Sequence, residues 1–349
     1  MSRKTAIWHL LIFIFCALFG AQYLLRLFAT RGDVRSEVDS SQISSLVAGL
    51  KSQNPDYIMI GDSMLDTRVD EALISKISGR RFFLYCRGGT STAAWYLYLK
   101  NVIVKSGVKP KAIIFLFRNQ YLTWPRFRVD DMYKANLDRL KVGVDPLVTE
   151  LIYPQPSKWK QPVAWTRNVL FGPNGIYFSK TAAAQFHTKI ENLALDLTSL
   201  GQKKDDRKVY MGKRFSLASL RPDLATEATG ETVVSDNSYD ARPRIFDPSP
   251  NKSFLPHIVS LGRDNGIPLV FFRVKCRPDR DNITPQTEEM VEYIYNLQAW
   301  MLEQKCLYFD ETKDTSITLP MYQDGDHISI ESKPWWTSYF WQRMEPILP

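Results

Sequence analysis

Five short apolar segments, each bounded by polar residues, stand out along the chain after residue 55. Each is continuous rather than alternating and rich in Ile, Val, Leu and Phe, which is typical of strands that are covered on both faces. The pattern therefore predicts the parallel sheet of an α/β protein. The expected strands are residues 57–60, 82–85, 112–117, 268–274 and 306–309.

Stretches with helical spacing lie between most of these strands, at residues 69–77, 93–106 and 287–304. The repeated strand-helix order predicts a three-layer, doubly wound sheet with right-handed crossovers. The third and fourth strands are separated by about 150 residues, far more than a crossover needs. We therefore interpret residues 121–255 as an insertion, either a cap or a partner-binding subdomain, within a domain at 56–349. A further helix is expected at 189–200, and loops at 201–253.

The N-terminal segment is different in character. Residues 6–29 form an apolar run about long enough to cross a bilayer as a helix, and Arg3 and Lys4 precede it. We expect an uncleaved anchor at residues 1–30 and a linker at 31–55, with the N-terminus in the cytoplasm and the rest of the chain periplasmic. The alternative is a cleaved signal peptide with a mature chain beginning near Gly32. The run exceeds a usual signal-peptide core and lacks a small-x-small cleavage site, which favours the anchor.

Composition and charge exclude several classes of protein. The 349 residues are 44% hydrophobic and 23% charged, which excludes a disordered or coiled-coil chain. A net charge of +8 indicates an anionic neighbour, but no nucleic-acid-binding motif accompanies it. The four cysteines lack the spacing of a metal site, so we expect no metal and no cofactor. Outside the cytoplasm, Cys276 and Cys306 are candidates for a disulfide.

Residues that can take part in catalysis follow the expected strands. Ligands of an open parallel sheet collect beyond the carboxyl ends of its strands, so these positions are diagnostic. Together they supply a hydroxyl nucleophile, a glycine amide, a side-chain amide and a carboxylate-imidazole pair, which are the components of acyl transfer. The segments are Gly61-Asp62-Ser63, Cys86-Arg87-Gly88-Gly89-Thr90, Arg118-Asn119-Gln120 and Asp324-Gly325-Asp326-His327.

Each segment alone also has a structural interpretation, and only their joint order at strand ends favours a catalytic one. The alternatives are a capping box of Ser63 and Asp66, a tight turn at Gly88 and Gly89, backbone capping by Asn119, and a surface pair of Asp324 and His327.

The four segments resemble the blocks of the SGNH (GDSL-type) hydrolases, a family named for its separated Ser, Gly, Asn and His. The resemblance covers about residues 56–120 and 268–330 and implies a flavodoxin-like sheet. Met64 replaces the family's Leu, while Phe117 and Gln120 replace a Gly and an Asp, and these departures disfavour a simple lipase or esterase. The matching pieces are Gly61-Asp62-Ser63, Gly89-Thr90, Arg118-Asn119 and Asp324-x-x-His327.

The resemblance implies a role for each residue. His327 takes the proton of the Ser63 hydroxyl, and Asp324 orients the imidazole. The oxyanion is bound by the backbone N–H groups of Ser63 and Gly89 and by the amide of Asn119. Asp326 is the runner-up to Asp324, and Gly88 the runner-up to Gly89.

An anchored, diverged SGNH domain also resembles the accessory proteins of alginate O-acetylation and teichoic-acid D-alanylation. That similarity implies an O-acyltransferase, with acetyl as the expected acyl group, that acts on a cell-envelope or exported polysaccharide beside an MBOAT-type membrane partner. An extracytoplasmic esterase or deacetylase uses the same residues, and a non-catalytic scaffold with a vestigial site is the third alternative.

Two further groups of residues have open interpretations. Arg68, Arg87 and Arg118 lie near the expected site, and they either contact an anionic acceptor or are solvated or paired within the structure. The aromatic residues of two helices also have two interpretations. They either stack on sugars or lie at the membrane interface, or they pack in the core against the sheet, and we favour core packing. They are Trp95, Tyr96 and Tyr98, and Trp335, Trp336, Tyr339, Phe340 and Trp341.

Overall fold

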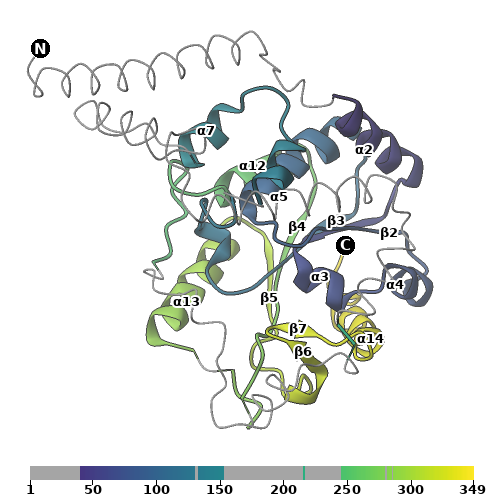
Figure 1. Ribbon diagram of the computed structural model, residues 1–349, viewed down its shortest axis with the longest axis vertical. Helices are drawn as coiled ribbons and strands as arrows, with labels where there is room; N and C mark the ends of the chain where they lie inside the picture. Colours follow the sequence, from purple (N-terminus) through teal and green to yellow (C-terminus); the bar gives the residue numbers. More distant parts are fainter. Residues whose placement is uncertain (1–39, 130–132, 153–214, 217–244, 280, 285) are drawn as a thin grey trace, which may run out of the picture.

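The computed structural model describes residues 40–129, 133–152, 215–216, 245–279, 281–284 and 286–349 (Figure 1). The expected anchor at 1–30, the expected helix at 189–200 and most of the 121–255 insertion lie outside the described residues. Within the described ranges, no helix is both long and apolar enough to cross a membrane.

A five-stranded parallel sheet forms the centre of the molecule, in the order β2-β1-β3-β4-β5 (Figure 1). Every expected strand is present with its ends shifted by at most one residue, which confirms the doubly wound α/β fold. The strand order reverses between β1 and β3, where a crevice opens at the carboxyl ends. The strands are β1 (Tyr57–Gly61), β2 (Phe82–Cys86), β3 (Ala112–Phe117), β4 (Leu269–Arg273) and β5 (Leu307–Asp310).

Helices cover both faces of this sheet and complete the three expected layers. One face packs on α2 (Ser40–Gln53), α5 (Thr92–Tyr98), η1 (Leu99–Val104), α12 (Leu255–Asp264) and α13 (Glu288–Glu303). The other face packs on α3 (Ser63–Arg68), α4 (Glu71–Ser78) and α14 (Lys333–Met344). The remaining described elements are η2 (Tyr121–Thr123), α6 (Lys134–Asp138), α7 (Pro146–Ile152), η7 (Leu319–Met321) and the antiparallel pair β6 (Tyr322–Asp324) and β7 (His327–Ile328).

Two helices differ from the sequence prediction at their ends. The single helix expected at 69–77 is preceded by a separate short helix, α3, and α4 begins only after Asp70, whose carboxylate accepts the N–H groups of Ala72 and Leu73. The helix expected at 93–106 continues from α5 into the π-helix η1. The helix expected at 287–304 corresponds to α13.

The aromatic residues of α5 and α14 mostly pack in the core, as favoured. Trp95, Tyr96 and Tyr98 are buried against one face of the sheet, and Trp336, Phe340 and Trp341 against the other. Trp335 is the exception, because it is 40% exposed and stacks on the Tyr339 ring at 5.1 Å.

The suggested disulfide between Cys276 and Cys306 is wrong, since no disulfide joins the two residues in the fold. Cys276 lies beyond the carboxyl end of β4, whereas Cys306 precedes the amino end of the neighbouring parallel strand β5. The two cysteines therefore lie at opposite ends of the sheet. The Sγ of Cys276 donates a hydrogen bond to Oδ1 of Asn119, at 3.3 Å.

Candidate active site

Ser63 and His327 meet beside the carboxyl edge of the sheet although 264 residues separate them in sequence. Nε2 of the imidazole lies 2.9 Å from the Ser63 Oγ, which is hydrogen-bonding distance. Ser63 is the first residue of α3, and His327 is the first residue of β7. The structure thus joins the expected nucleophile to the expected base.

A sharp turn after β1 places Ser63 in this position. A Cβ atom on Gly61 would lie only 2.7 Å from the Leu65 Cβ, so the turn requires glycine. The next residue, Asp62, caps α3 by accepting the Met64 N–H at its Oδ1, 2.9 Å away. Because Asp62 is the cap, the alternative of a capping box beginning at Ser63 is wrong.

His327 lies just past the turn of the β6–β7 hairpin. Gly325 has φ +52° at this turn, and the Asp324 and His327 backbones pair across it. The Asp324 side chain lies outside the described residues, so its place in a triad stays a prediction. For Nε2 to accept the Ser63 proton, Nδ1 must carry the other proton of the ring.

Asp326, the runner-up carboxylate, is committed to other partners. Its Oδ2 forms a buried ion pair with Arg118, and its Oδ1 accepts the backbone N–H of Arg277 at 2.8 Å. Its backbone carbonyl accepts a hydrogen bond from Arg68 at 3.1 Å. These contacts identify Asp326 as a connection between the hairpin, β3, β4 and α3.

The loop after β2 is attached to the nucleophile turn. The N–H of Arg87 and the hydroxyl of Thr90 both donate to the Gly61 carbonyl, each at 3.3 Å. Gly89 has φ +75°, whereas Gly88 is exposed with open space around it. The position that requires glycine is therefore Gly89, and its role as an oxyanion donor stays a prediction.

Asn119 has φ +51°, an unusual conformation for a residue other than glycine and one that is often found at functional sites. Its Oδ1 accepts the Cys276 thiol, and its amide also contacts the Tyr121 hydroxyl. Burial raises the pKa of that hydroxyl. These contacts fix the side chain two residues beyond β3, where a donor to the oxyanion is predicted.

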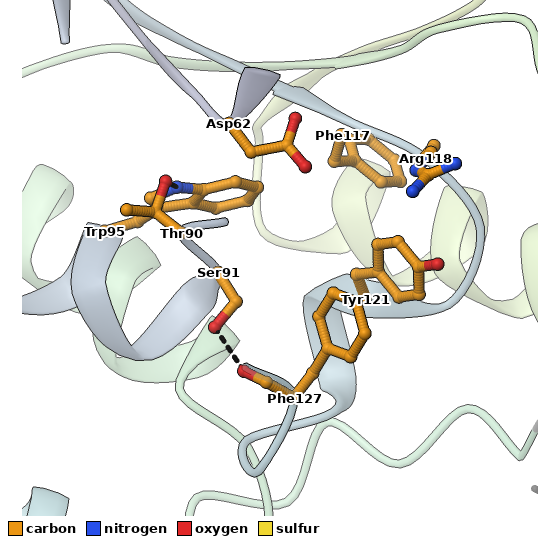
Figure 2. A pocket seen from close by; sticks show the side chains of 8 residues that line it. All are labelled: Asp62, Thr90, Ser91, Trp95, Phe117, Arg118, Tyr121 and Phe127. Carbon is orange, nitrogen blue, oxygen red and sulfur yellow. Dashed lines mark hydrogen bonds between the residues drawn. The ribbon is translucent and has the colours of Figure 1, made fainter. Parts of the chain in front are cut away.

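A small pocket opens next to these residues (Figure 2). Its wall includes Asp62, Thr90 and Arg118, which are the chain neighbours of Ser63, Gly89 and Asn119. Ser91 donates its hydroxyl to the Phe127 carbonyl at 2.6 Å and closes one side. The other lining residues are Trp95, Phe117, Tyr121 and Phe127, so the pocket is largely aromatic.

The expected substrate contact of Arg68 is wrong. Its side chain is fully buried, and Nη2 donates to the backbone carbonyls of Lys275 at 2.9 Å and of Asp326. It therefore presents no surface to a substrate and instead holds α3 against the hairpin. Arg118 is also buried and ion-paired, although it lines the pocket, so its contact with an acceptor stays a prediction.

Buried charges lie beneath the site. Glu311 is 4.0 Å from the Arg68 guanidinium, and burial raises the pKa of its carboxyl to about 7. Burial also lowers the pKa of Lys275, whose ammonium donates to the carbonyls of Asn282, Asp314 and Ile317. Within the described residues, no cluster of His, Cys, Asp and Glu is arranged to hold a metal ion.

Several residues that contact the site carry no sequence signal. Arg128, Tyr133 and Phe215 belong to the insertion and match no motif. Arg128 pairs with Asp62 at 3.1 Å, Tyr133 lies against Gly89, and Phe215 packs on the His327 ring. Only three-dimensional placement reveals them.

Comparisons with known proteins add a limited result. No family model matches the chain, and no curated protein matches it. One similar solved structure is a candidate acylhydrolase from Bacteroides fragilis, with 10% identity over 86% of this chain and 96% of that chain, at a TM-score of 0.36. Another is a GDSL-like lipase from Bacteroides thetaiotaomicron, with 9% identity over 89% of this chain and 99% of that chain, also at 0.36. Likenesses this distant carry no argument, so the interpretation rests on the site itself.

Proposed function

We propose that this chain is a serine acyltransferase that works through an acyl-Ser63 intermediate. The observation that carries the proposal is the 2.9 Å contact between Ser63 Oγ and His327 Nε2 at the carboxyl edge of the sheet. A hydroxyl within hydrogen-bonding distance of an imidazole is the arrangement that activates serine as a nucleophile.

The reaction has two steps. In the first, His327 Nε2 takes the Ser63 proton while Oγ forms a bond to the acyl carbonyl carbon, and the bond to the leaving oxygen then breaks as His327 returns the proton to it. In the second, His327 takes the proton of an acceptor hydroxyl as its oxygen attacks the acyl carbon, and the bond from that carbon to Ser63 Oγ then breaks as His327 returns the proton to Oγ. In both steps the backbone N–H groups of Ser63 and Gly89 and the amide of Asn119 stabilise the oxyanion.

We assign the acceptor to a cell-envelope or exported polysaccharide, and the acyl group to acetate. The resemblance to accessory proteins of polymer O-acylation supports this, together with the apolar segment at 6–29 and the net charge of +8. In this proposal the domain lies outside the cytoplasmic membrane, anchored by its N-terminus, and an MBOAT-type membrane protein is the acyl donor; the same resemblance supports both assignments.

An acyl-transfer assay tests the proposal. Full-length protein in detergent is incubated with an activated acetyl ester, with and without glycan. A transferase gives O-acetylated glycan that increases with acceptor and releases acetate slowly, and Ser63→Ala abolishes both activities. Equal acetate release with and without glycan identifies an esterase instead. Wild-type envelope acylation in cells that carry only Ser63→Ala identifies a scaffold.

A further inference from the structure

The insertion contacts the catalytic apparatus at three separate places. Its residue Arg128 reaches the turn that carries Ser63, Tyr133 reaches the glycine loop, and Phe215 reaches His327. A remote cap would touch none of these, so each contact points to a role inside the site.

Phe215 covers the catalytic imidazole. The two ring centroids are 4.7 Å apart at 36°, and Phe215 is only 3% exposed. The Phe215 carbonyl accepts the Ile330 N–H at 2.9 Å, and the neighbouring Ser216 hydroxyl donates to Glu331. These bonds tie the Phe215 backbone to the segment that follows His327. A packed ring restricts rotation of the imidazole and so keeps Nε2 directed at Ser63.

Arg128 stabilises the turn before the nucleophile. Its Nη1 pairs with Oδ2 of Asp62, whose other oxygen caps α3. The guanidinium is itself held between the rings of Phe127 and Tyr133, at 4.9 and 5.5 Å from their centroids. Arg128 has φ +52°, a backbone conformation that needs support from its surroundings. Because Ser63 is the first residue of α3, fixing the cap fixes the hydroxyl.

Tyr133 and its neighbour in α6 hold the glycine loop. A Cβ atom added to Gly89 would overlap the Tyr133 ring, which shows that the ring lies directly against this backbone. Asn136 accepts a hydrogen bond from Nε of Arg87 at 2.7 Å and donates to the Gly88 carbonyl at 3.4 Å. The backbone N–H at Gly89 is thereby held in one orientation.

We propose that Phe215, Arg128 and Tyr133 are positioning residues, through which the insertion holds the base, the nucleophile turn and the glycine loop in register for acyl transfer. This inference rests on the proposed serine chemistry. It assigns to the insertion a function within the active site, in addition to any contact with a partner.

Phe215→Ala tests the inference most directly, and Phe246→Ala is its matched control. Phe246 also belongs to the insertion, but it packs on Tyr293 and Trp300 of α13. The full-length variants are compared by the rate at which a fluorophosphonate labels Ser63 and by kcat and KM with 4-nitrophenyl acetate. Phe215→Leu preserves an apolar cover and is the conservative variant, and Arg128→Met, which removes the contact with Asp62, keeps the test valid if Phe215→Ala does not fold.

We expect Phe215→Ala to lower both kcat and the labelling rate about tenfold or more, with KM within about twofold of wild type. Phe215→Leu should recover most of this loss, and Phe246→Ala should retain wild-type rates. Arg128→Met should likewise lower the labelling rate, with Arg128→Lys closer to wild type. If wild-type protein is labelled but a folded Phe215→Ala protein is labelled as fast as Phe246→Ala, Phe215 has no positioning role and the inference is overturned. Where Phe215→Ala does not fold, a wild-type labelling rate of Arg128→Met overturns it instead. If wild-type protein itself is not labelled, the proposed function fails first.

Discussion

Arg118 and Asp326 form an ion pair that is only 4% exposed on each side. Arg118 directly precedes Asn119, and Asp326 directly precedes His327, so one buried interaction joins the segments that carry Asn119 and His327. The Arg277 N–H and the Arg68 guanidinium bind the same aspartate and extend the connection to β4 and to the nucleophile helix. Asp326 thus connects three of the four site segments, those of Ser63, Asn119 and His327, with the chain that follows β4.

Removing one partner of this pair should be strongly destabilising. Asp326→Asn leaves the buried Arg118 charge poorly compensated, which typically costs about 3 to 5 kcal/mol of unfolding free energy. The double variant Arg118→Met/Asp326→Leu removes both charges and should lose less unfolding free energy than the sum of the losses of the single variants Arg118→Met and Asp326→Leu. Urea denaturation of all three measures the coupling, and additive losses would contradict a direct interaction.

Substitution of the two adjacent glycines should have unequal effects. Gly89→Ala must place a methyl group into the Tyr133 ring at φ +75°, whereas Gly88→Ala meets open space. We expect Gly89→Ala to lower kcat at least tenfold, on the order of 1 to 2 kcal/mol in the barrier, through displacement of the oxyanion N–H. Gly88→Ala should stay within about twofold of wild type. Equal losses in steady-state kinetics would identify Gly88 as the donor or the loop as purely structural.

The sheet could be predicted because its strands are buried on both faces, and continuous apolar runs such as β3 (Ala112–Phe117) record that burial directly. The ends of α3 and α4 could not, since the break at Val69 and Asp70 depends on capping and on the hydrogen bond from the Asp70 N–H to the Thr337 hydroxyl. That contact joins residues 267 positions apart, and no local pattern contains it.

The residues of the candidate site also fall into two groups, those that a local sequence pattern predicts and those that only tertiary contacts define. Ser63 and His327 could be predicted because each belongs to a short motif that follows a strand and contains a reactive residue type. The sequence shows only that residue 68 is an arginine, and an arginine can either bind a substrate or donate to backbone carbonyls in the core. The burial of Arg68, which donates to three such carbonyls, decides between these roles. Phe215 contributes an apolar ring, which carries no signal of its own in a sequence.

The raised pKa of Glu311 predicts a dependence of stability on pH. Its carboxyl titrates near 4.5 in the unfolded chain and at about 7 in the fold, because burial disfavours the charged form. The folded state therefore binds the proton more tightly, and this contribution to stability is complete below pH 4.5 and is lost as pH rises to about 7. Between these pH values the unfolding free energy falls by roughly 3 kcal/mol through Glu311 alone.

Glu311→Gln keeps an oxygen for the Lys275 N–H and cannot ionise, so its unfolding free energy should fall less between pH 4.5 and 7 than that of wild type. Urea denaturation at several pH values gives this slope. Glu303→Gln, the same substitution at an exposed residue of α13, is the control. Parallel slopes for all three proteins would show that Glu311 does not titrate in this range.

Asn119→Ala should separate oxyanion stabilisation from nucleophilic catalysis. Loss of one oxyanion donor costs about 100- to 1000-fold in kcat, whereas Ser63→Ala removes the covalent pathway itself. Cys276→Ala removes only the weak thiol donor to Asn119 Oδ1, so its loss should stay below about fivefold. The acetyl-ester assay ranks the variants, and denaturation checks that each is folded. A folded Asn119→Ala protein with wild-type kcat would exclude this side chain from the oxyanion hole, and the donors would then be the N–H groups of Ser63 and Gly89 alone.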